Sequence, residues 1–403
     1  MSMKNILFLQ IYGGGGISGG TEVYLKNLLK ELSRKHPNDT FHVATFNKKN
    51  SIFATYGKVY DSFFTRFLEN WNVLTLGYRF SFLGFFQYLW GFFWLYRISS
   101  DIIEKKKIDF VYSNGGSLTA LVAYFLFKKY NVPYILHFHG LFNFKNTLNA
   151  TTFSLQALFT RKSTKLALQH ASHIVGNSDE VVADINSVSD IKKRARVVHC
   201  FVDTDIFYPN NKKSARNKLK LNQNDFIFLS PNRLDKDKGI DFLLTVIPIL
   251  KNQDIKIIFI GNGPLEGSVI KLSKKNPKVM YISQIRNELL PEYIAAADIV
   301  WGAASLHYIG LSIIEALACE RPIMALNTPS PPDNEFDTLV DPRTIPDDVG
   351  YLVEKNPESC ARLIDTLSNQ RELLEKKSQS CIDFYNREYG ITHFEKIEKI
   401  IYN

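Results

Sequence analysis

The stretch Ala297–Leu326 constrains the fold of this chain more than any other. Two short apolar runs in it, Asp298–Trp301 and Pro322–Leu326, are typical of buried parallel strands, and Leu311–Ala318 between them has helical spacing. The expected helix begins just after Gly310, at the carboxyl end of the first strand. Free backbone N–H groups and the positive end of the helix dipole attract anions at such a position. The stretch therefore predicts a strand–helix–strand unit with an anion-binding turn.

Glu315 lies one turn inside this expected helix and faces the same turn. Its carboxylate can accept hydrogen bonds from a hydroxylated ligand, and its neighbours in the sequence are mostly apolar. The alternative is a solvated helix carboxylate, because glutamate is usually exposed. Both interpretations stay open on the sequence.

Strands alternate with helices along the rest of the 403 residues. In the first half we expect strands at Lys4–Ile11, Phe41–Phe46, Ile108–Ser113, Pro133–His137, His173–Gly176 and Val197–Val198. In the second half we expect further strands at Phe226–Ser230, Ile255–Ile260 and Val279–Ile282, and helices in the tail, the last at Thr392–Tyr402. Asn143–Thr164 has the composition of a polar connection, and Asn210–Asn224 is charged. The pattern predicts an α/β fold of two doubly wound, Rossmann-like domains, residues 1–200 and 201–403, with the last helix a candidate to pack back on the first domain.

A glycine-rich loop, residues 12–20, directly follows the first expected strand, and a helix starts at Thr21. Phosphate sites use this order, because glycines let the backbone approach a ligand and the helix start supplies N–H donors. The loop fits neither GxGxxG nor a P-loop, so a merely flexible loop is the alternative.

The segment Asn232–Gly239, NRLDKDKG, places Arg233 and Lys238 between an expected strand and the next helix. A guanidinium fork and a lysine charge beside free N–H groups suit a diphosphate. Solvated surface cations are the alternative interpretation.

Two histidines close the strand Pro133–His137, in the sequence HFHG. Open α/β sheets bind ligands at the carboxyl ends of their strands. We expect strand alternation to turn His137 away from His139, which makes His137 a core histidine. His139, beside Gly140, is then the better candidate for a ligand contact.

Positive charge is concentrated in the first half of the chain. The net charge is +9, but residues 1–200 carry 24 Lys and Arg against 12 Asp and Glu, whereas residues 201–403 carry 25 against 28. This asymmetry predicts an anionic partner for the first half, either membrane phospholipid or an acidic substrate. Nucleic acid is disfavoured, because the basic residues are scattered and accompany no helix-turn-helix, zinc-finger or RNP-like pattern.

The run Val73–Ile98 is the most aromatic in the chain. Arg79, Gln87 and Arg97 interrupt it, and its unbroken apolar stretches are shorter than the roughly 20 residues that cross a bilayer. A buried helix fits the run, and so does an interfacial helix with aromatic rings in the lipid and cations at the headgroups. We favour packing, with membrane docking as the alternative.

The spacing of the cysteines and the sequence near the N-terminus indicate in which cellular compartment the protein is expected. The four cysteines lie far apart and lack the spacing of metal ligands, which favours a reduced protein without a metal site; they are Cys200, Cys319, Cys360 and Cys381. The apolar run Ile6–Ile11 is too short for a signal-peptide core. We expect a cytoplasmic protein, with the inner face of the membrane as its place of lipid contact.

Taken together, these loops resemble those of the retaining, nucleotide-sugar-dependent glycosyltransferases of family 4 (glycosyl transferases group 1), which have the GT-B fold. NRLDKDKG is similar to the family's GRLxxxKG, and GNGP at Gly261–Pro264 is similar to its GxGP. The stretch AADIVWGAASLHYIGLSIIEALACERPIMA resembles AAADxxxxPSxxExFGxxxxEAMAxGxPVIA. In the first half, SGGTE resembles the GGxE loop and HFHG the histidine–glycine turn.

The resemblance implies two facing Rossmann-like domains with an interdomain cleft, the acceptor on the first domain and the nucleotide sugar on the second. It implies catalytic roles for His139, Arg233, Lys238, His307 and Glu315. It implies donor contacts from Gly19, Gly20, Arg233, Lys238, Gly263, Gly310, Leu311, Ser312 and Glu315, with the cations on the diphosphate and Glu315 on the ribose. No metal and no cofactor are implied besides the UDP- or GDP-linked donor, because cations and helix termini neutralise the leaving diphosphate.

The sequence departs from the family pattern at His307, where the family has a glutamate that contacts the donor sugar. Histidine donates, or carries a positive charge, where the family has an acceptor. We predict a hexosyltransferase-like enzyme that acts with retention on a hydroxyl of a glycan or lipid-linked acceptor, in glycoconjugate or polysaccharide biosynthesis. The alternatives are a nucleotide-sugar 2-epimerase and an inactive nucleotide-sugar-binding partner subunit.

Overall fold

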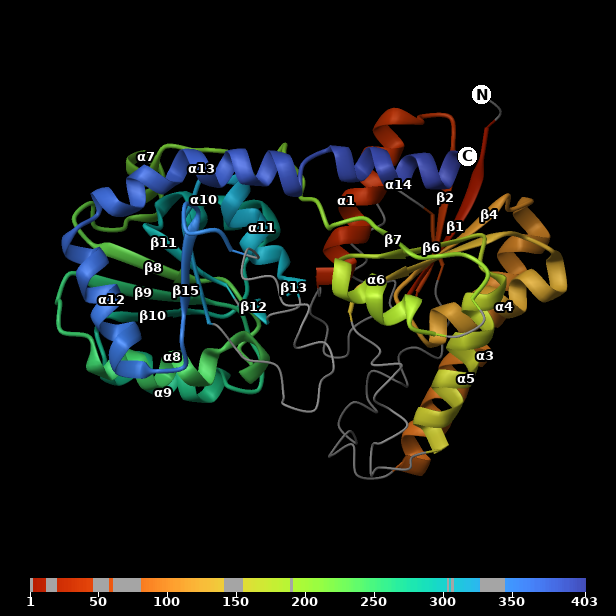
Figure 1. Cartoon of the computed structure of the whole chain (residues 1–403), viewed down its shortest axis with the longest axis horizontal. Coiled ribbons are helices and arrows are strands. Elements are labelled where there is room, and N and C mark those ends of the chain that lie inside the picture. The colour runs from red at the N-terminus through yellow and green to blue at the C-terminus, as the bar shows by residue number, and fades with distance from the viewer. Residues whose placement is uncertain are drawn as a thin grey trace. The chain divides into compact units, whose positions relative to one another are not determined.

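The computed structural model describes residues 3–11, 20–45, 58–60, 81–140, 155–188, 191–302, 304–305, 308–326 and 345–403. The chain divides into two compact units, Met1–Cys200 together with Thr392–Asn403, and Phe201–Ile391. Figure 1 labels the elements of both units. Within the described residues, none of the helices is both long enough and apolar enough to cross a membrane.

The first unit is built on a parallel sheet in the order β3-β2-β1-β4-β5-β6-β7, with helices around it (Figure 1). Its strands are β1 (Asn5–Gln10), β2 (Thr40–Ala44), β3 (Lys58–Tyr60), β4 (Phe110–Asn114), β5 (Tyr134–Phe138), β6 (His173–Gly176) and β7 (Arg196–Val197). Its helices are α1 (Gly20–Lys35), α3 (Ser81–Lys106), α4 (Leu118–Tyr130), α5 (Leu155–His170), α6 (Asp179–Asn186) and α14 (Thr392–Tyr402).

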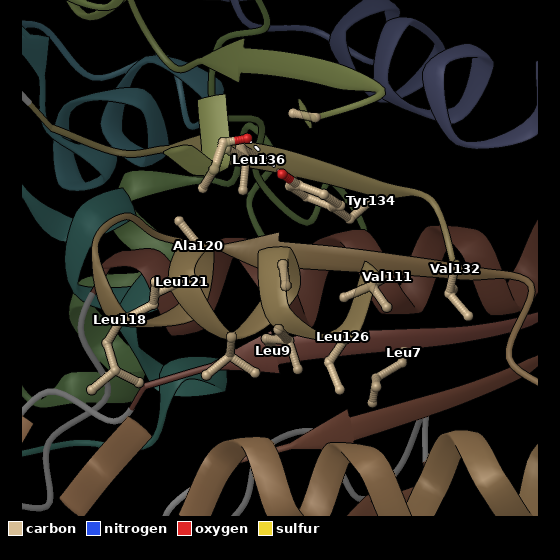
Figure 2. Packing of buried hydrophobic residues seen from close by; sticks show 14 of the residues in the cluster. Leu7, Leu9, Val111, Leu118, Ala120, Leu121, Leu126, Val132, Tyr134 and Leu136 are labelled. Carbon is tan, nitrogen blue, oxygen red and sulfur yellow. Dashed lines mark hydrogen bonds between the residues drawn. The ribbon is translucent and has the colours of Figure 1, made fainter. Parts of the chain in front are cut away.

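The central strands of this sheet are buried on both faces, which is why they read as almost continuous apolar runs. Leu7 and Leu9 of β1 and Val111 of β4 lie in one core with Leu121 and Leu126 of α4 (Figure 2). All of these side chains are at most 3% exposed. Helix α4 therefore covers one face of the sheet and fixes the ends of β1 and β4.

The strand order of the first unit reverses between β1 and β4. These two strands are neighbours in parallel register, and Gln10 at the end of β1 is the register partner of Asn114 at the end of β4. Ligands of open α/β sheets bind outside the carboxyl ends of the strands at such a reversal. Two amide side chains occupy that position here.

The second unit repeats the plan with a parallel sheet in the order β10-β9-β8-β11-β14-β15. Its strands are β8 (Phe226–Ser230), β9 (Ile255–Ile260), β10 (Val279–Ile282), β11 (Ile299–Gly302), β14 (Ile323–Leu326) and β15 (Gly350–Val353), with a separate antiparallel pair β12 (Ala304–Ser305) and β13 (Tyr308–Ile309). Its α-helices are α7 (Lys212–Leu219), α8 (Ile240–Val246), α9 (Glu266–Lys275), α10 (Leu290–Ala296), α11 (Leu311–Ala318), α12 (Pro357–Asn369) and α13 (Glu372–Glu388), and its 3₁₀ turns are η3 (Lys236–Lys238), η4 (Ile247–Ile249) and η5 (Asn287–Leu289).

The reversal of strand order in this unit lies between β8 and β11, which pair in parallel. The loop after β8 carries Arg233 and Lys238, and the chain after β11 leads to α11. Helix α11 spans Leu311–Ala318 as the sequence predicts, and it follows Gly310 directly. The candidate phosphate loop and the candidate anion-binding helix therefore start from neighbouring strands.

Some elements differ from the sequence prediction because tertiary contacts decide them. Helix α5 begins at Leu155, inside the segment predicted as a polar connection, and α7 occupies a charged segment for which no element was predicted. Helix α7 is highly charged, but Arg216 is buried and its Nη2 donates to Asp298 Oδ2 at 2.7 Å. A local pattern cannot show this pairing, since Asp298 is 82 residues away.

Helix α14 belongs to the first unit, in agreement with the prediction that the last helix packs back on the first domain, although its residues were counted within 201–403. Its apolar side chains Ile397, Ile400 and Ile401 are buried. Glu398 accepts from Lys35 Nζ at 2.6 Å and lies 2.7 Å from His36 Nε2. These contacts with the end of α1 hold the C-terminus on the first unit.

Candidate functional site

The loop after β8 is tied to both β11 and α11 through Asn232. Asn232 Nδ2 donates to the carbonyl of Trp301 at 2.8 Å, and Asn232 Oδ1 accepts from Ser312 Oγ at 2.8 Å. Trp301 Nε1 in turn donates to the carbonyl of Lys238 at 2.9 Å. These bonds hold the start of the loop, its end and the first turn of α11 in one fixed arrangement.

Arg233 and Lys238 approach the same carboxylate oxygen. Asp237 Oδ2 lies 2.9 Å from Arg233 Nη2 and 3.7 Å from Lys238 Nζ, and Asp235 Oδ2 is 3.3 Å from Arg233 Nη2. The guanidinium is about half exposed, whereas the Lys238 side chain is 23% exposed. The two cations therefore point to one place, where an anionic oxygen fits between them.

Gly261 and Gly263 let the GNGP loop pass against the backbone of the β8 loop. Both have positive φ, 140° and 153°. A Cβ on Gly263 would lie 2.6 Å from the carbonyl oxygen of Leu234, and one on Gly261 would lie 2.3 Å from that of Asn232. The resemblance of GNGP to the family motif implied that Gly263 contacts the donor. In this structure Gly263 lies against the backbone of Leu234, so it supports the loop that carries Arg233 and Lys238.

We predict that Gly263→Ala lowers the free energy of unfolding by about 2 kcal/mol, because the new Cβ meets a backbone oxygen and alanine is strained at this φ. Gly267→Ala is the matched control, since a Cβ there meets no atom within 4 Å and lies in helix α9. The control should be about 0.5 kcal/mol more stable than wild type. Urea denaturation measures both changes, and equal midpoints for the two variants would contradict the prediction.

The first turn of α11 faces the same loop. Gly310, the residue before the helix, supplies no side-chain cap to the first turn, which includes Leu311 and Ser312, so N–H groups of this turn are candidates to bind an anion. Glu315 is 5% exposed, and burial raises the pKa of its carboxyl group to about 8. The solvated interpretation of Glu315 is therefore wrong: it is a buried acid one turn from the residue that contacts Asn232.

His139 of the first unit belongs to a chain of polar side chains at the ends of β1 and β4. Its Nε2 lies 2.7 Å from Asn114 Oδ1, and Asn114 Nδ2 donates to Gln10 Oε1 and, at 3.0 Å, to the carbonyl of Thr21. Burial lowers the pKa of His139 to about 3, so the ring is neutral. His139 thus lies at the carboxyl edge of the sheet, where the sequence placed it.

The prediction that His137 turns away from His139 is wrong. The two rings are 4.1 Å apart, because residues two apart in a strand project from the same face. His137 is fully buried, and its Nδ1 shares a 2.6 Å hydrogen bond with the hydroxyl of Tyr112. Burial holds the pKa of His137 well below its usual value. His137 is a neutral core histidine, as expected, but it also supports His139.

Other predicted site residues are placed only in part. Gly20 begins α1, and a Cβ built on it meets no heavy atom of the described residues within 4 Å. Gly19 and His307 lie outside the described residues. In the part of the chain that the structure describes, no three His, Cys, Asp or Glu residues cluster as metal ligands would. The four cysteines carry free thiols.

Sequence reasoning missed three amide side chains that organise the two sites, Gln10, Asn114 and Asn232. Gln10 and Asn114 end buried strands at a reversal of strand order, and Asn232 follows the end of β8 by two residues. A polar residue directly after an apolar run was a usable signal, because strand ends meet at one edge of a parallel sheet.

Family models match both halves of the chain. The model for Glycosyltransferase Family 4 matches residues 18–206, and the model for Glycosyl transferases group 1 matches residues 211–382. The chain belongs to the group 1 glycosyltransferases. The predicted family is thereby confirmed, and residues 211–382 include the Asn232 loop, Gly263 and α11.

Curated relatives of this group 1 glycosyltransferase are distant. D-inositol 3-phosphate glycosyltransferase 1 of Catenulispora acidiphila is 26% identical over 38% of this chain and 42% of its own length. A probable sucrose-phosphate synthase of Thermosipho melanesiensis is 25% identical over 70% of this chain and 73% of its own. The first alignment thus spans less than half of that relative.

Solved structures match the whole chain and confirm the predicted GT-B, two-domain α/β fold. A sucrose-phosphate synthase from Thermosynechococcus elongatus has a TM-score of 0.75 at 16% identity, with 99% of this chain and 98% of that one covered. Anabaena HepE, solved in complex with UDP-glucose, has a TM-score of 0.70 at 16% identity, with 98% and 99% covered.

Proposed function

We propose that this protein transfers a sugar from a nucleoside-diphosphate sugar to a hydroxyl group of a glycan or lipid-linked acceptor, with retention of configuration and without a metal ion. Its place would be the biosynthesis of a glycoconjugate or polysaccharide at the inner face of a membrane. A UDP-linked donor is favoured over a GDP-linked one, because HepE of similar fold binds UDP-glucose.

One observation carries the proposal: Arg233 and Lys238 approach a single carboxylate oxygen at the carboxyl end of β8. A diphosphate oxygen has the charge and size to take the place of Asp237 Oδ2. A fork of guanidinium donors and a lysine charge suit that group, and the first turn of α11, which Gly310 does not cap, offers N–H donors nearby.

The chemistry follows from where charge develops. When the sugar leaves, negative charge grows on the diphosphate, and fixed cations stabilise it without moving. Glu315, buried and joined to this loop through Ser312 and Asn232, can accept hydrogen bonds from the ribose hydroxyls. These groups account for a departing diphosphate without a metal, which is why we propose metal-independent transfer.

The test is to incubate the full chain with a panel of UDP- and GDP-linked sugars and extracted lipid-linked or glycan acceptors, with and without EDTA. We expect addition of one sugar by mass spectrometry, an α-linked product from an α-linked donor, and no effect of EDTA. A nucleotide-sugar epimer formed without acceptor would identify a 2-epimerase instead. Donor binding with no transfer to any acceptor would identify an inactive partner subunit.

We infer that a lipid surface contacts helices α3 and α4 of the first unit. Trp90, Phe93 and Phe125 are exposed there, and Phe125 packs against α3 through Phe92, ring to ring at 5.4 Å. Arg97 lies one turn from Phe93 and over the ring of Trp94 at 5.5 Å. Exposed rings beside cations are the composition of an interfacial helix at anionic lipid.

We predict that the double change Trp90→Ser and Phe93→Ser weakens binding to phosphatidylglycerol vesicles by about tenfold or more, because burying the exposed part of each ring in lipid contributes about 0.7 kcal/mol or more. Tyr208→Ser is the matched control, since Tyr208 is equally exposed but lies in the second unit. Vesicle sedimentation measures binding. Equal losses in the double variant and the control would contradict this docking face.

A further inference from the structure

The hydrogen-bonded series of side chains Gln10, Asn114 and His139 has a fixed direction of donors and acceptors. It starts at Gln10, whose Nε2 donates to the carbonyl of Ile11 at 2.7 Å. A backbone carbonyl can only accept, so the amide orientation of Gln10 is set and its Oε1 is left as an acceptor. The next residue, Asn114, supplies the donor to that oxygen.

Asn114 is oriented in the same way, at a second carbonyl. Its Nδ2 donates to the carbonyl of Thr21 at 3.0 Å as well as to Gln10. Gln10 Oε1 and the Thr21 carbonyl are both acceptors, so Asn114 Nδ2 must face them and Asn114 Oδ1 must face His139. His139 Nε2 lies 2.7 Å from this oxygen and therefore carries the proton. A neutral imidazole protonated at Nε2 has its lone pair at Nδ1.

We propose that Gln10 and Asn114 are positioning residues that hold His139 in the Nε2–H tautomer, so that Nδ1 is an obligatory hydrogen-bond acceptor for a hydroxyl group of the bound sugar. The sugar in this statement rests on the proposed function, whereas the tautomer rests on the contacts alone. An acceptor at this point favours neutral sugars over uronic acids, since a carboxylate offers no proton to Nδ1 and repels its lone pair.

The surroundings of His139 keep it neutral. His137 contacts its ring at 4.1 Å and Tyr24 at 4.9 Å. Behind them, burial raises the pKa of Tyr112 above its usual value and that of Cys200 to about 12, so both stay protonated. Each of these four residues is uncharged at neutral pH. Among the described residues, the contact of Nε2 with Asn114 Oδ1 then decides which nitrogen of His139 holds the proton.

The first experiment needs no activity. Long-range ¹H–¹⁵N spectra of the full chain labelled with ¹⁵N-histidine report the tautomer, with His139 assigned from the signals lost in His139→Gln. We expect a protonated Nε2 and an unprotonated Nδ1 from pH 6 to 8. A protonated Nδ1, or an even mixture of tautomers, would overturn the proposal whether or not the protein transfers sugar.

Asn114→Asp separates positioning from a merely structural role. The new carboxylate still accepts from Nε2, but its charge raises the pKa of His139, so that Nδ1 also becomes protonated at low pH. We expect kcat/KM with a neutral donor sugar to fall by about tenfold at pH 6, the cost of one lost acceptor, and to recover as pH rises. Ser113→Ala, the neighbouring buried change on β4, should keep the wild-type pH profile. Parallel profiles for Asn114→Asp and wild type would overturn the proposal.

Discussion

Arg233→Ala and Lys238→Ala are each expected to abolish the stabilisation that a nucleotide sugar gives this protein and to lower kcat/KM by about 100-fold or more. The reason is that both cations approach one oxygen position, so that neither alone compensates a diphosphate. For wild type, a donor at 100 times its dissociation constant should add about 2.7 kcal/mol to the free energy of unfolding. Thermal unfolding with a panel of nucleotide sugars measures this gain.

Lys236→Ala is the matched control for these two variants. Lys236 lies in the same loop, is exposed and carries the same charge, but it contributes no side chain to the Asp237 oxygen. It should keep the wild-type shift and rate. If both Arg233→Ala and Lys238→Ala were stabilised by donor as wild type is, the diphosphate position assigned here would be wrong even if the protein transferred sugar.

The sequence predicts the sheet better than the surface around it. Strands such as Phe226–Ser230 and Ile255–Ile260 were placed to the residue, because a strand buried on both faces is a continuous apolar run. The charged helix Lys212–Leu219 was missed, because the pairing of Arg216 with Asp298 is a tertiary contact. Periodicity reports which face of an element is apolar, and it cannot report a buried ion pair.

The candidate site was predicted as residue types and only partly as contacts. The motif placed Arg233 and Lys238 in one loop, but their shared approach to Asp237 depends on a φ of 65° at Gly239 and on the bond from Trp301 to the Lys238 carbonyl. Likewise, the spacing of His137 and His139 was misjudged, although the two-residue period of a strand places them together. The amides that orient these groups come from other strands, which spacing along the chain does not show.

Glu315→Gln is expected to make the protein more stable and less able to bind its donor. Glu315 is 5% exposed, and burial raises the pKa of its carboxyl group from 4.5 to about 8. Between these values the unfolded chain ionises while the folded one keeps the proton, so the wild-type free energy of unfolding falls as pH rises. The loss is complete only above pH 8 and amounts to at most about 5 kcal/mol.

Glutamine at this position cannot ionise, so the stability of Glu315→Gln should stay level from pH 5 to pH 8 while that of wild type declines. Below pH 8 the folded wild type holds a neutral carboxylic acid at this position, and glutamine replaces its O–H group by an amide NH₂ that cannot accept from a ribose hydroxyl. The loss of one neutral hydrogen bond costs about 0.5–1.5 kcal/mol, so donor affinity should drop by about threefold to tenfold. Thermal unfolding across this pH range, with and without a UDP-linked sugar, measures both effects on one protein.

Glu320→Gln controls for the loss of one negative charge, because Glu320 directly follows the end of the same helix region and is only half-buried. It should keep the wild-type donor affinity. Parallel stability curves for wild type and Glu315→Gln would show that the carboxyl group ionises as freely in the folded protein as in the unfolded chain. A ribose contact would then need another residue, since a freely solvated carboxylate is not held in place for it. We expect Glu315→Gln to raise the free energy of unfolding and to lower donor affinity. A binding residue in an apolar site must show both effects, because the burial that weakens the fold also keeps water from competing with the ligand.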